Sequence, residues 1–209
     1  MITRSAFASF LMLSAVAPAM ADELPSVAGH FQVRLRAVGV LPDPSANITV
    51  SGAPIGGKTS ISDSAVPEAD VTYFITDHIG VEAIAAVTKH TVSNSVACRV
   101  GSVSLLPPTV TVQYHFDPTG PIRPYVGAGV NYTMFYKVSN GLPNLDFKNN
   151  FGWALQAGAD VPLGDGPYFL NLDVKKIFLH TTINAAAGTV RASANLDPWL
   201  VGTGIGIRF

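Results

Sequence analysis

Alternation of bulky side chains with small or polar ones is the dominant pattern along this chain. It is clearest at the C-terminal end, where every second residue is bulky and mostly apolar: Trp199, Val201, Thr203, Ile205, Ile207 and Phe209. The residues between them are mainly glycine, with Arg208 near the end. Successive side chains of a β-strand point to opposite faces, so this period of two predicts a strand with one apolar face.

The same alternation recurs in seven earlier segments at roughly even spacing. They lie at residues 31–36, 70–75, 80–88, 109–116, 125–134, 152–161 and 168–175. Together with the last segment they predict eight antiparallel strands. Alternation alone does not separate a membrane barrel from a soluble sandwich, because the strands of both have one apolar and one polar face.

The lengths of the connections separate these two folds. Short turns fall at residues 76–78, 117–121 and 164–167. The last two contain proline and glycine, which fix the dihedrals of a tight reversal. Long connections fall between them, at 42–67, 93–106, 137–150 and 182–195. Outer-membrane barrels have short periplasmic turns and long extracellular loops. The sequence therefore predicts an all-β fold, an eight-stranded antiparallel transmembrane β-barrel.

Composition supports a membrane protein that does not span with helices. Charged residues are 13% of the chain, against about a quarter in a typical soluble domain, and the mean hydropathy is positive. No stretch beyond the N-terminal segment is apolar over the length of a spanning helix. Helices and closed barrels are the two structures that satisfy every backbone group in lipid.

The first residues have the layout of an export signal. Arg4 precedes an apolar stretch from Phe7 to Val16. Ala19 and Ala21 then supply small residues at the two positions that an export peptidase recognises. An N-terminal membrane anchor is the alternative, but about ten apolar residues are too few to span as a helix. We expect a signal peptide at 1–21, cleaved after Ala21, and a barrel domain at 22–209 in the outer membrane of a Gram-negative bacterium.

Phe209 is a candidate residue for membrane assembly. The chain stops on this aromatic, on the same face as Ile207 and Ile205. A closed barrel must pair its last strand with its first, and a terminal aromatic fits the girdle at the membrane interface. An ordinary last strand is the alternative.

Two long motifs resemble the OmpW family of small outer-membrane barrels. They are LPPTVTVQYHF at residues 106–116 and RPYVGAGVNYT at 123–133, with LDPW at 196–199 and a closing Arg208-Phe209. The resemblance covers nearly the whole chain after the signal. It implies an eight-stranded barrel whose narrow interior is proposed to pass small apolar solutes, and surface loops that serve phage or bacteriocins as receptors. Where family members can carry a bulky aromatic inside the barrel, this chain has Lys175, which argues against an uninterrupted apolar conduit.

Strand parity assigns a polar network to the barrel interior. Its members are Arg34, Arg36, Glu68, Asp70, Glu82, Gln113, His115, Asp160, Asp173, Lys175 and Arg208. Buried charges are tolerated when paired, and eight strands leave room for little beyond side chains, so we expect an ion-paired plug. Lys175 would pair with Asp173, or across the barrel with Glu82 or Asp160. Lys89 and Lys176 face outward by the same parity, where lipopolysaccharide phosphates are possible partners.

Catalytic, metal and cofactor sites are not expected. Glu82, His115 and Asp173 are chemically capable, but they lie on different strands, without a nucleophile motif, metal-ligand spacing or phosphate loop. The net charge of −1 gives no basic field for nucleic acid. Cys98 is the single cysteine, which excludes an intramolecular disulfide and leaves a reactive thiol or an ordinary loop residue.

The sequence supports two functions. The first is a narrow channel for small hydrophobic molecules, with a possible apolar mouth in the first long connection at Ile48, Val50, Ile55 and Ile61. Those residues could equally pack over the barrel top. The second is a non-transporting structural or receptor barrel with a plugged lumen. Expected partners are outer-membrane lipids, lipopolysaccharide, the barrel-assembly machinery and a small hydrophobic solute.

Overall fold

The computed structural model describes residues 26–56, 59–95, 98–139 and 144–209. The expected signal peptide at 1–21 lies outside these ranges. Apart from a short 3₁₀ turn, η1 (Ala186–Gly188), every regular element is a strand. Within the described ranges, no helix is long and apolar enough to cross a membrane. The strands are β1 (Phe31–Leu41), β2 (Ser45–Val50), β3 (Ala53–Ile55), β4 (Thr59–Ile61), β5 (Ser64–Phe74), β6 (Ile79–Ala86), β7 (Thr88–Asn94), β8 (Cys98–Leu106), β9 (Thr109–His115), β10 (Arg123–Ser139), β11 (Asp146–Phe147), β12 (Asn150–Pro162), β13 (Tyr168–Ala185), β14 (Val190–Asn195) and β15 (Trp199–Arg208).

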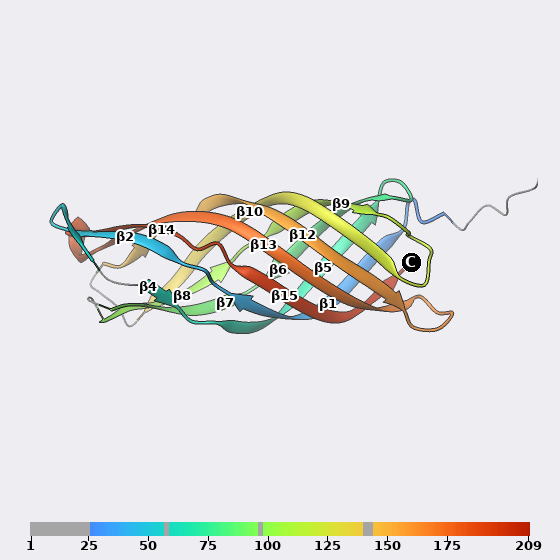
Figure 1. The fold of residues 1–209 in the computed structure, drawn as a ribbon, viewed down its shortest axis with the longest axis horizontal. Helices are drawn as coiled ribbons and strands as arrows, with labels where there is room; N and C mark the ends of the chain where they lie inside the picture. The colour runs from blue at the N-terminus through green and yellow to red at the C-terminus, as the bar shows by residue number, and fades with distance from the viewer. Residues whose placement is uncertain (1–25, 57–58, 96–97, 140–143) are drawn as a thin grey trace, which may run out of the picture.

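Eight of these strands close into an antiparallel barrel (Figure 1). Going around the wall, the order is β1, β5, β6, β9, β10, β12, β13 and β15, and β15 pairs with β1 again. The predicted eight-stranded antiparallel barrel is confirmed.

The two ends of the chain close the barrel wall. Phe31 and Phe209 exchange two backbone hydrogen bonds, with N···O distances of 2.8 and 2.9 Å, and their rings stack with centroids 6.4 Å apart. The C-terminus lies at the end of the barrel that carries the short turns (Figure 1). Short turns mark the periplasmic end of such barrels, so the opposite end is extracellular.

The long connections are not loops, and this part of the sequence analysis was wrong. Most of their residues form strands that lengthen the wall past the membrane. On one side β7, β8, β4 and the end of β10 pair together, and on the other β2, β3, β14 and the end of β13. Cys98 begins β8 rather than lying in a loop. These extensions hold because they still bury an apolar inner face, which includes Val92, Val103 and Leu105.

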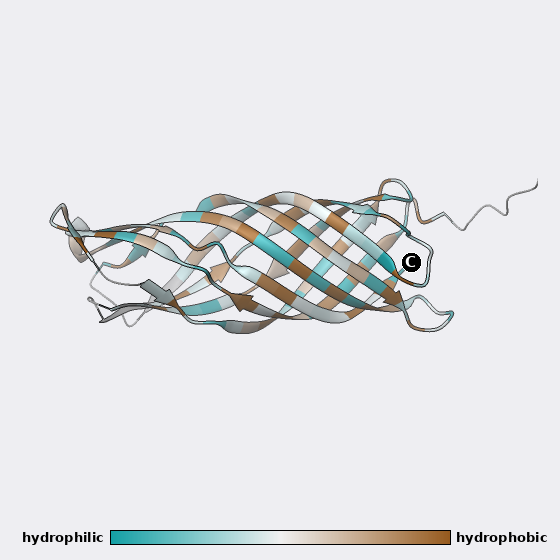
Figure 2. Cartoon of the chain, in the orientation of Figure 1, coloured by the Kyte–Doolittle hydropathy of each residue, from teal (hydrophilic) through white to brown (hydrophobic). Residues whose placement is uncertain are grey.

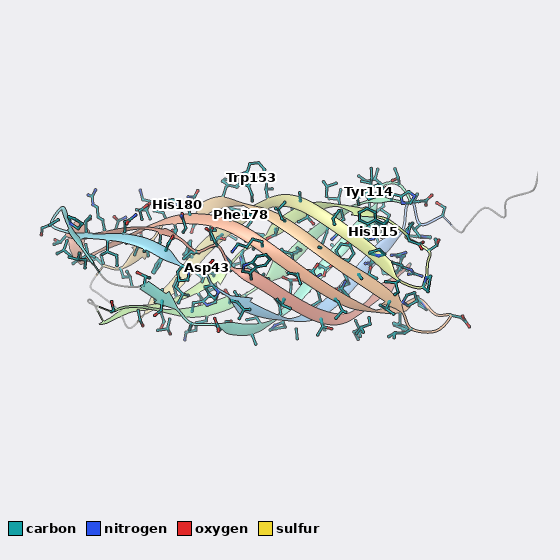
Figure 3. The ribbon with its side chains drawn as sticks, viewed as in Figure 1. Asp43, Tyr114, His115, Trp153, Phe178 and His180 are labelled. Atoms are coloured by element: carbon teal, nitrogen blue, oxygen red, sulfur yellow. The ribbon has the colours of Figure 1, made fainter. Side chains whose placement is uncertain are left out.

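The outer and inner faces of the membrane barrel differ in chemistry. Hydrophobic and hydrophilic residues alternate along its strands (Figure 2), and the large apolar side chains point outward. Trp153 is 69% exposed and projects away from the wall (Figure 3). On β9 the inward positions from Thr109 to His115 are buried, while the alternate positions from Val110 to Tyr114 are exposed. An apolar outer surface of this kind suits lipid rather than water.

Candidate functional site: an ionic network beneath an apolar cavity

Two arginines on β1 form the centre of the barrel interior. Arg34 and Arg36 are two residues apart, so both point inward, and they are 0% and 2% exposed. The Arg34 guanidinium donates to Asp70 at 2.7 Å and to Glu82 at 2.5 Å. Arg36 lies 2.7 Å from Glu68 and 2.9 Å from Asp70. Because β5 and β6 follow β1 around the wall, three adjacent strands supply this cluster.

The far wall completes the network with neutral donors and two carboxylates. Asp173 on β13 accepts from the Tyr125 hydroxyl and from Gln156, both at 2.8 Å. Asn171 donates to Asp160 at 2.7 Å. A Cβ on Gly158, which pairs with Tyr125 across the strands, would collide with the Tyr125 hydroxyl. Glycine at this position makes room for the ring inside the barrel.

The periplasmic end of the interior is closed by a second set of contacts. Gln32 donates to Asp160 at 2.9 Å and accepts from Arg208 at the same distance. Arg208 also donates to the carbonyl of Pro118 in a periplasmic turn at 2.7 Å, and its guanidinium lies 4.7 Å from the centre of the Phe74 ring. Phe74 is fully buried, so this end is filled by both polar and aromatic groups.

His115 and Gln113 occupy the same interior, as their parity predicts. The His115 Nε2 and Gln113 Oε1 atoms are 3.1 Å apart. Gln113 in turn donates to Gln156 at 3.3 Å, and Thr111 donates to Glu82 at 2.9 Å. The inward residues of β9 therefore join the arginine cluster to the far wall.

Lys175 lies at the top of this network and is 1% exposed. Its Nζ atom is 3.7 Å from Glu68 and 3.8 Å from Asp173. Asp173 was an expected partner, whereas the cross-barrel candidates Glu82 and Asp160 were wrong. Glu68 is the partner across the barrel instead. It lies two residues before Asp70 on β5 and on the same inward face, which places it nearer to the extracellular end and next to Lys175.

The network fills the centre of the barrel with paired charges. Five carboxylates face four cations, and most of these side chains are buried: Glu68, Asp70, Glu82, Asp160 and Asp173 against Arg34, Arg36, Lys175 and Arg208. Each charge has an oppositely charged neighbour within 4.0 Å. The pairing is not complete in hydrogen bonds, because single atoms of Arg34, Arg36, Asp70 and Arg208 have no hydrogen-bond partner within the described part of the chain, and the bore of eight strands has little space besides these side chains.

Above the network the interior becomes apolar and opens into a cavity. Its walls come from inward residues of the upper strands, namely Val38, Val40, Val66, Ile84, Phe135, Phe147, Ile177, Leu179, Leu196 and Leu200. The cavity encloses about 880 Å³ of empty space, open solvent at its mouth included, and the centre of a water molecule can reach about 70 Å³ of it. Glu68 and Lys175 are the charged residues among its lining. The result is a narrow apolar slot with a polar floor.

Only part of the predicted apolar mouth reaches this cavity. Ile61 lines it, and Ile48 packs beside the buried cluster formed by Val92, Val103 and Ile183. Val50 and Ile55 lie farther out on the β2–β3 pair, each half-buried. The inward residues Val38, Ile177 and Leu200 were missed, although each follows from the parity of its strand.

His90 keeps the cavity wall uncharged near neutral pH. It lies on β7, beyond the membrane barrel, and its Nδ1 atom is 2.7 Å from the carbonyl of Ser62. A carbonyl only accepts, so Nδ1 carries the proton of the neutral ring. Burial lowers the pKa of His90, which favours this neutral form.

The barrel wall is interrupted beside the cavity. Strand pairing between β6 and β9 stops at Ile84 and Thr109, and pairing between β7 and β8 resumes at Thr88 and Leu105. Pro107 and Pro108 stand between these pairs and have no N–H to donate. The cavity reaches this break, because its lining includes Ala86, Thr88, Pro107 and Thr109.

Two lysines lie on the outward face of their strands. Lys176 donates to the carbonyl of Asp197 at 2.6 Å and lies 4.9 Å from the centre of the Trp199 ring. Lys89 is exposed on β7. Both face away from the interior, as parity predicts.

The chemically capable trio does not assemble into a catalytic set. Glu82 is held by the two arginines, Asp173 by Tyr125 and Gln156, and the His115 Nε2 atom lies beside Gln113. Among the described residues, no group of three or more histidine, cysteine or acidic side chains is arranged to hold a metal ion.

The fold and this interior define an outer-membrane β-barrel. A family model described as the OmpW family matches residues 27–209. The chain belongs to the OmpW family, whose barrels are generally non-enzymatic, and it resides in the outer membrane of a Gram-negative bacterium.

Relatives and solved structures are similar over most of their length. The uncharacterized outer-membrane protein y4mB of Sinorhizobium fredii is 44% identical over 186 residues, which cover 86% of this chain and 80% of the relative. The dibenzothiophene metabolism operon protein PahQ of Pseudomonas aeruginosa is 30% identical over 217 residues, covering both chains fully. The crystal structure of OprG from Pseudomonas aeruginosa has a TM-score of 0.79 at 27% identity, covering 87% of this chain and 96% of OprG.

Proposed function

We propose that this protein carries small hydrophobic molecules across the outer membrane and is not an enzyme. A molecule enters the apolar cavity from outside and leaves it sideways, through the break in the wall between β6–β7 and β8–β9. The observation that carries this proposal is the stacking of an open apolar cavity directly above a closed ionic network.

The order of these two layers determines the route. An apolar solute that reaches Glu68 and Lys175 would have to displace paired, buried charges to go farther, and stranding such charges is costly. The wall beside Pro107 has no complete hydrogen-bond ladder to break. Val87, at the same level, is 53% exposed on the outer surface. A lateral exit therefore costs less than passage along the axis.

One relative supports the class of solute. The name of the Pseudomonas aeruginosa relative assigns it to an operon for dibenzothiophene metabolism, and dibenzothiophene is an uncharged, apolar aromatic molecule. A cavity lined mainly by valine, leucine, isoleucine and phenylalanine binds such molecules by removing apolar surface from water.

A receptor barrel that transports nothing is the second candidate. The closed network favours it, because it blocks the axial path for ions and polar solutes. The extracellular strand extensions would then be the functional surface. Solute uptake separates the two functions, since a receptor needs no empty cavity.

Three partner interactions are also proposed. The exposed terminal aromatic Phe209 is a recognition element for the barrel-assembly machinery. Lys176 and Lys89 lie where they can meet lipopolysaccharide phosphates. The mouth residue Ile61 contacts the hydrophobic solute as it enters the cavity.

Uptake of octane by cells tests the transport proposal with a matched pair of variants. Leu200→Trp fills the cavity, because Leu200 points inward and lines it. Val201→Trp is the control, because the next residue points outward and is 49% exposed. We expect Leu200→Trp to reduce uptake to the level of cells without the protein, while Val201→Trp retains wild-type uptake. Equal uptake by both variants, at equal amounts of folded barrel, would favour the receptor instead.

A further inference from the structure

The floor of the apolar cavity carries a polar pair that a purely hydrocarbon ligand cannot use. Glu68 and Lys175 both line the cavity, and their Oε1 and Nζ atoms are 3.7 Å apart. That separation is too long for a hydrogen bond between them. It is short enough for one oxygen atom to lie within about 2.8 Å of both.

Three of the four other polar side chains of the lining already have partners. The Thr109 hydroxyl donates to the carbonyl of Pro107, and the Thr133 hydroxyl donates to Asn131. The His90 Nδ1 atom is engaged with Ser62. Lys175 approaches its two carboxylates at 3.7 and 3.8 Å, so its ammonium protons are available to a ligand.

We propose that the cavity prefers apolar molecules that end in one uncharged hydroxyl group, seated between Lys175 and Glu68. This inference rests on the proposed function and names its substrate class. A hydroxyl both accepts and donates hydrogen bonds, so it accepts one from the Lys175 ammonium and donates one to the Glu68 carboxylate. The apolar body then lies between Val38, Ile177 and Leu200, which line the cavity above the floor.

The charges of the network exclude the alternative head groups. A carboxylate head would add a negative charge where five carboxylates already face four cations, and it has no proton to give to Glu68. An ammonium head would meet Lys175 and has no lone pair to accept from it. A hydrocarbon end would cover the Lys175 ammonium without giving it a hydrogen bond, and a buried charge without one is costly, whereas Glu68 keeps its contact with Arg36 at 2.7 Å.

Four probes of equal chain length test this preference: 1-octanol, octane, octanoate and octylamine. The full-length barrel is placed in lipid nanodiscs, and binding is followed by the amide NMR shifts of Ile177 and Leu200, which line the cavity. Each probe's concentration in the bilayer is measured, and binding is referred to it, so that the different partition of the four probes does not enter the ranking. We expect 1-octanol to bind more tightly than octane by about tenfold, the effect of one hydrogen bond to a charged group. Octanoate and octylamine should bind more weakly than 1-octanol.

Two substitutions locate the source of the preference. Lys175→Met keeps most of the side-chain volume and should remove the preference for 1-octanol while octane still binds. Lys148→Met, which removes an exposed charge outside the cavity lining, should retain it. If Lys175→Met does not fold, the ranking of the four probes on the wild-type barrel decides alone.

The outcomes separate this inference from the function on which it rests. Equal binding of octane and 1-octanol to the wild type would overturn the hydroxyl preference and leave the transport proposal standing. Tighter binding of octanoate would also overturn it, in favour of an anionic head. If none of the four probes shifts the amides of the cavity, the proposed function itself fails.

Discussion

Phe31 and Phe209 hold the two ends of the chain together through a pair of backbone hydrogen bonds of 2.8 and 2.9 Å. Their rings stack on the outside of the barrel, where Phe209 is 63% exposed. The last residue of the chain therefore closes the wall and also displays an aromatic ring at the membrane interface. Both roles place it among the residues that assembly depends on.

Removing the terminal aromatic should impair insertion. We expect Phe209→Asp to lower the amount of barrel in the outer membrane, because it puts a charge in the interfacial girdle and weakens the contact with Phe31. The fraction of protein that migrates differently before and after boiling measures folded barrel. The matched control is Ile122→Asp, an exposed apolar residue in a periplasmic turn. Equal losses for the two variants would contradict a special role for the terminal strand. Phe147, which lies in the connection at 137–150, is unsuitable as a control because it is buried.

Lys175 should contribute to stability through its carboxylate neighbours. Lys175→Ala removes a cation from beside Glu68 and Asp173, and breaking a buried pair costs about 3–5 kcal/mol. We expect the lower end of that range, because the two N···O distances of 3.7 and 3.8 Å exceed hydrogen-bond length. Adding Glu68→Gln should recover much of the loss. Urea titration of the folded barrel in detergent gives the free energy of unfolding and so measures both effects. No change in the single variant would mean that Lys175 is solvated.

Ion conductance should depend on the arginines far more than on Lys175. Removing Lys175 leaves the layers of Arg36 and Arg34 beneath it intact, so Lys175→Ala should conduct as little as the wild type in a planar bilayer. Arg34→Ala combined with Arg36→Ala empties the centre of the network and should raise the single-channel conductance. Unaltered conductance in a double variant that folds would show that the network is not what closes the barrel.

Asp77 should release the N-terminal segment at low pH. In its periplasmic turn, the carboxylate accepts from the Ser26 hydroxyl and from the backbone N–H groups of Val27 and Ala28, and these bonds lower its pKa. A depressed pKa means that the attachment is fully present above the ordinary carboxyl pKa of about 3.9. The attachment is lost as the pH falls through the lowered pKa of Asp77. Exchange protection of the Val27 and Ala28 amides should follow this course. Loss of protection already above the ordinary pKa would contradict it.

The alternation of side chains predicted the membrane barrel because one physical constraint acts on every strand. Each residue faces either lipid or the interior, so parity alone placed Gln113, His115 and Lys175 inside. Parity does not give the level of a residue along the axis. The partner of Lys175 on its own strand, Asp173, was predicted, but the partner across the barrel was therefore assigned to Glu82 or Asp160, whereas the stagger between strands brings Glu68 to it.

The extracellular half was harder to predict for a related reason. Here the interior is apolar, so inward and outward residues no longer differ in hydropathy, as in the run from Ala37 to Leu41 on β1. Without that contrast the strand extensions resembled loops, and the cavity residues Val38 and Leu200 were not recognised. Comparing the inward positions of neighbouring strands, and noting that all are apolar at the same level, would have identified the cavity residues.

The position of a bound apolar molecule tests the central claim most directly. The barrel can be crystallised with 1-bromooctane, whose bromine is located by its anomalous scattering. We expect the bromine and its chain within the cavity bounded by Val38, Ile177 and Leu200, above Lys175. Bromine found below Arg34 would contradict a cavity that receives apolar molecules above a closed ionic network. Bromine bound at high occupancy only on the lipid-facing surface would contradict it as well.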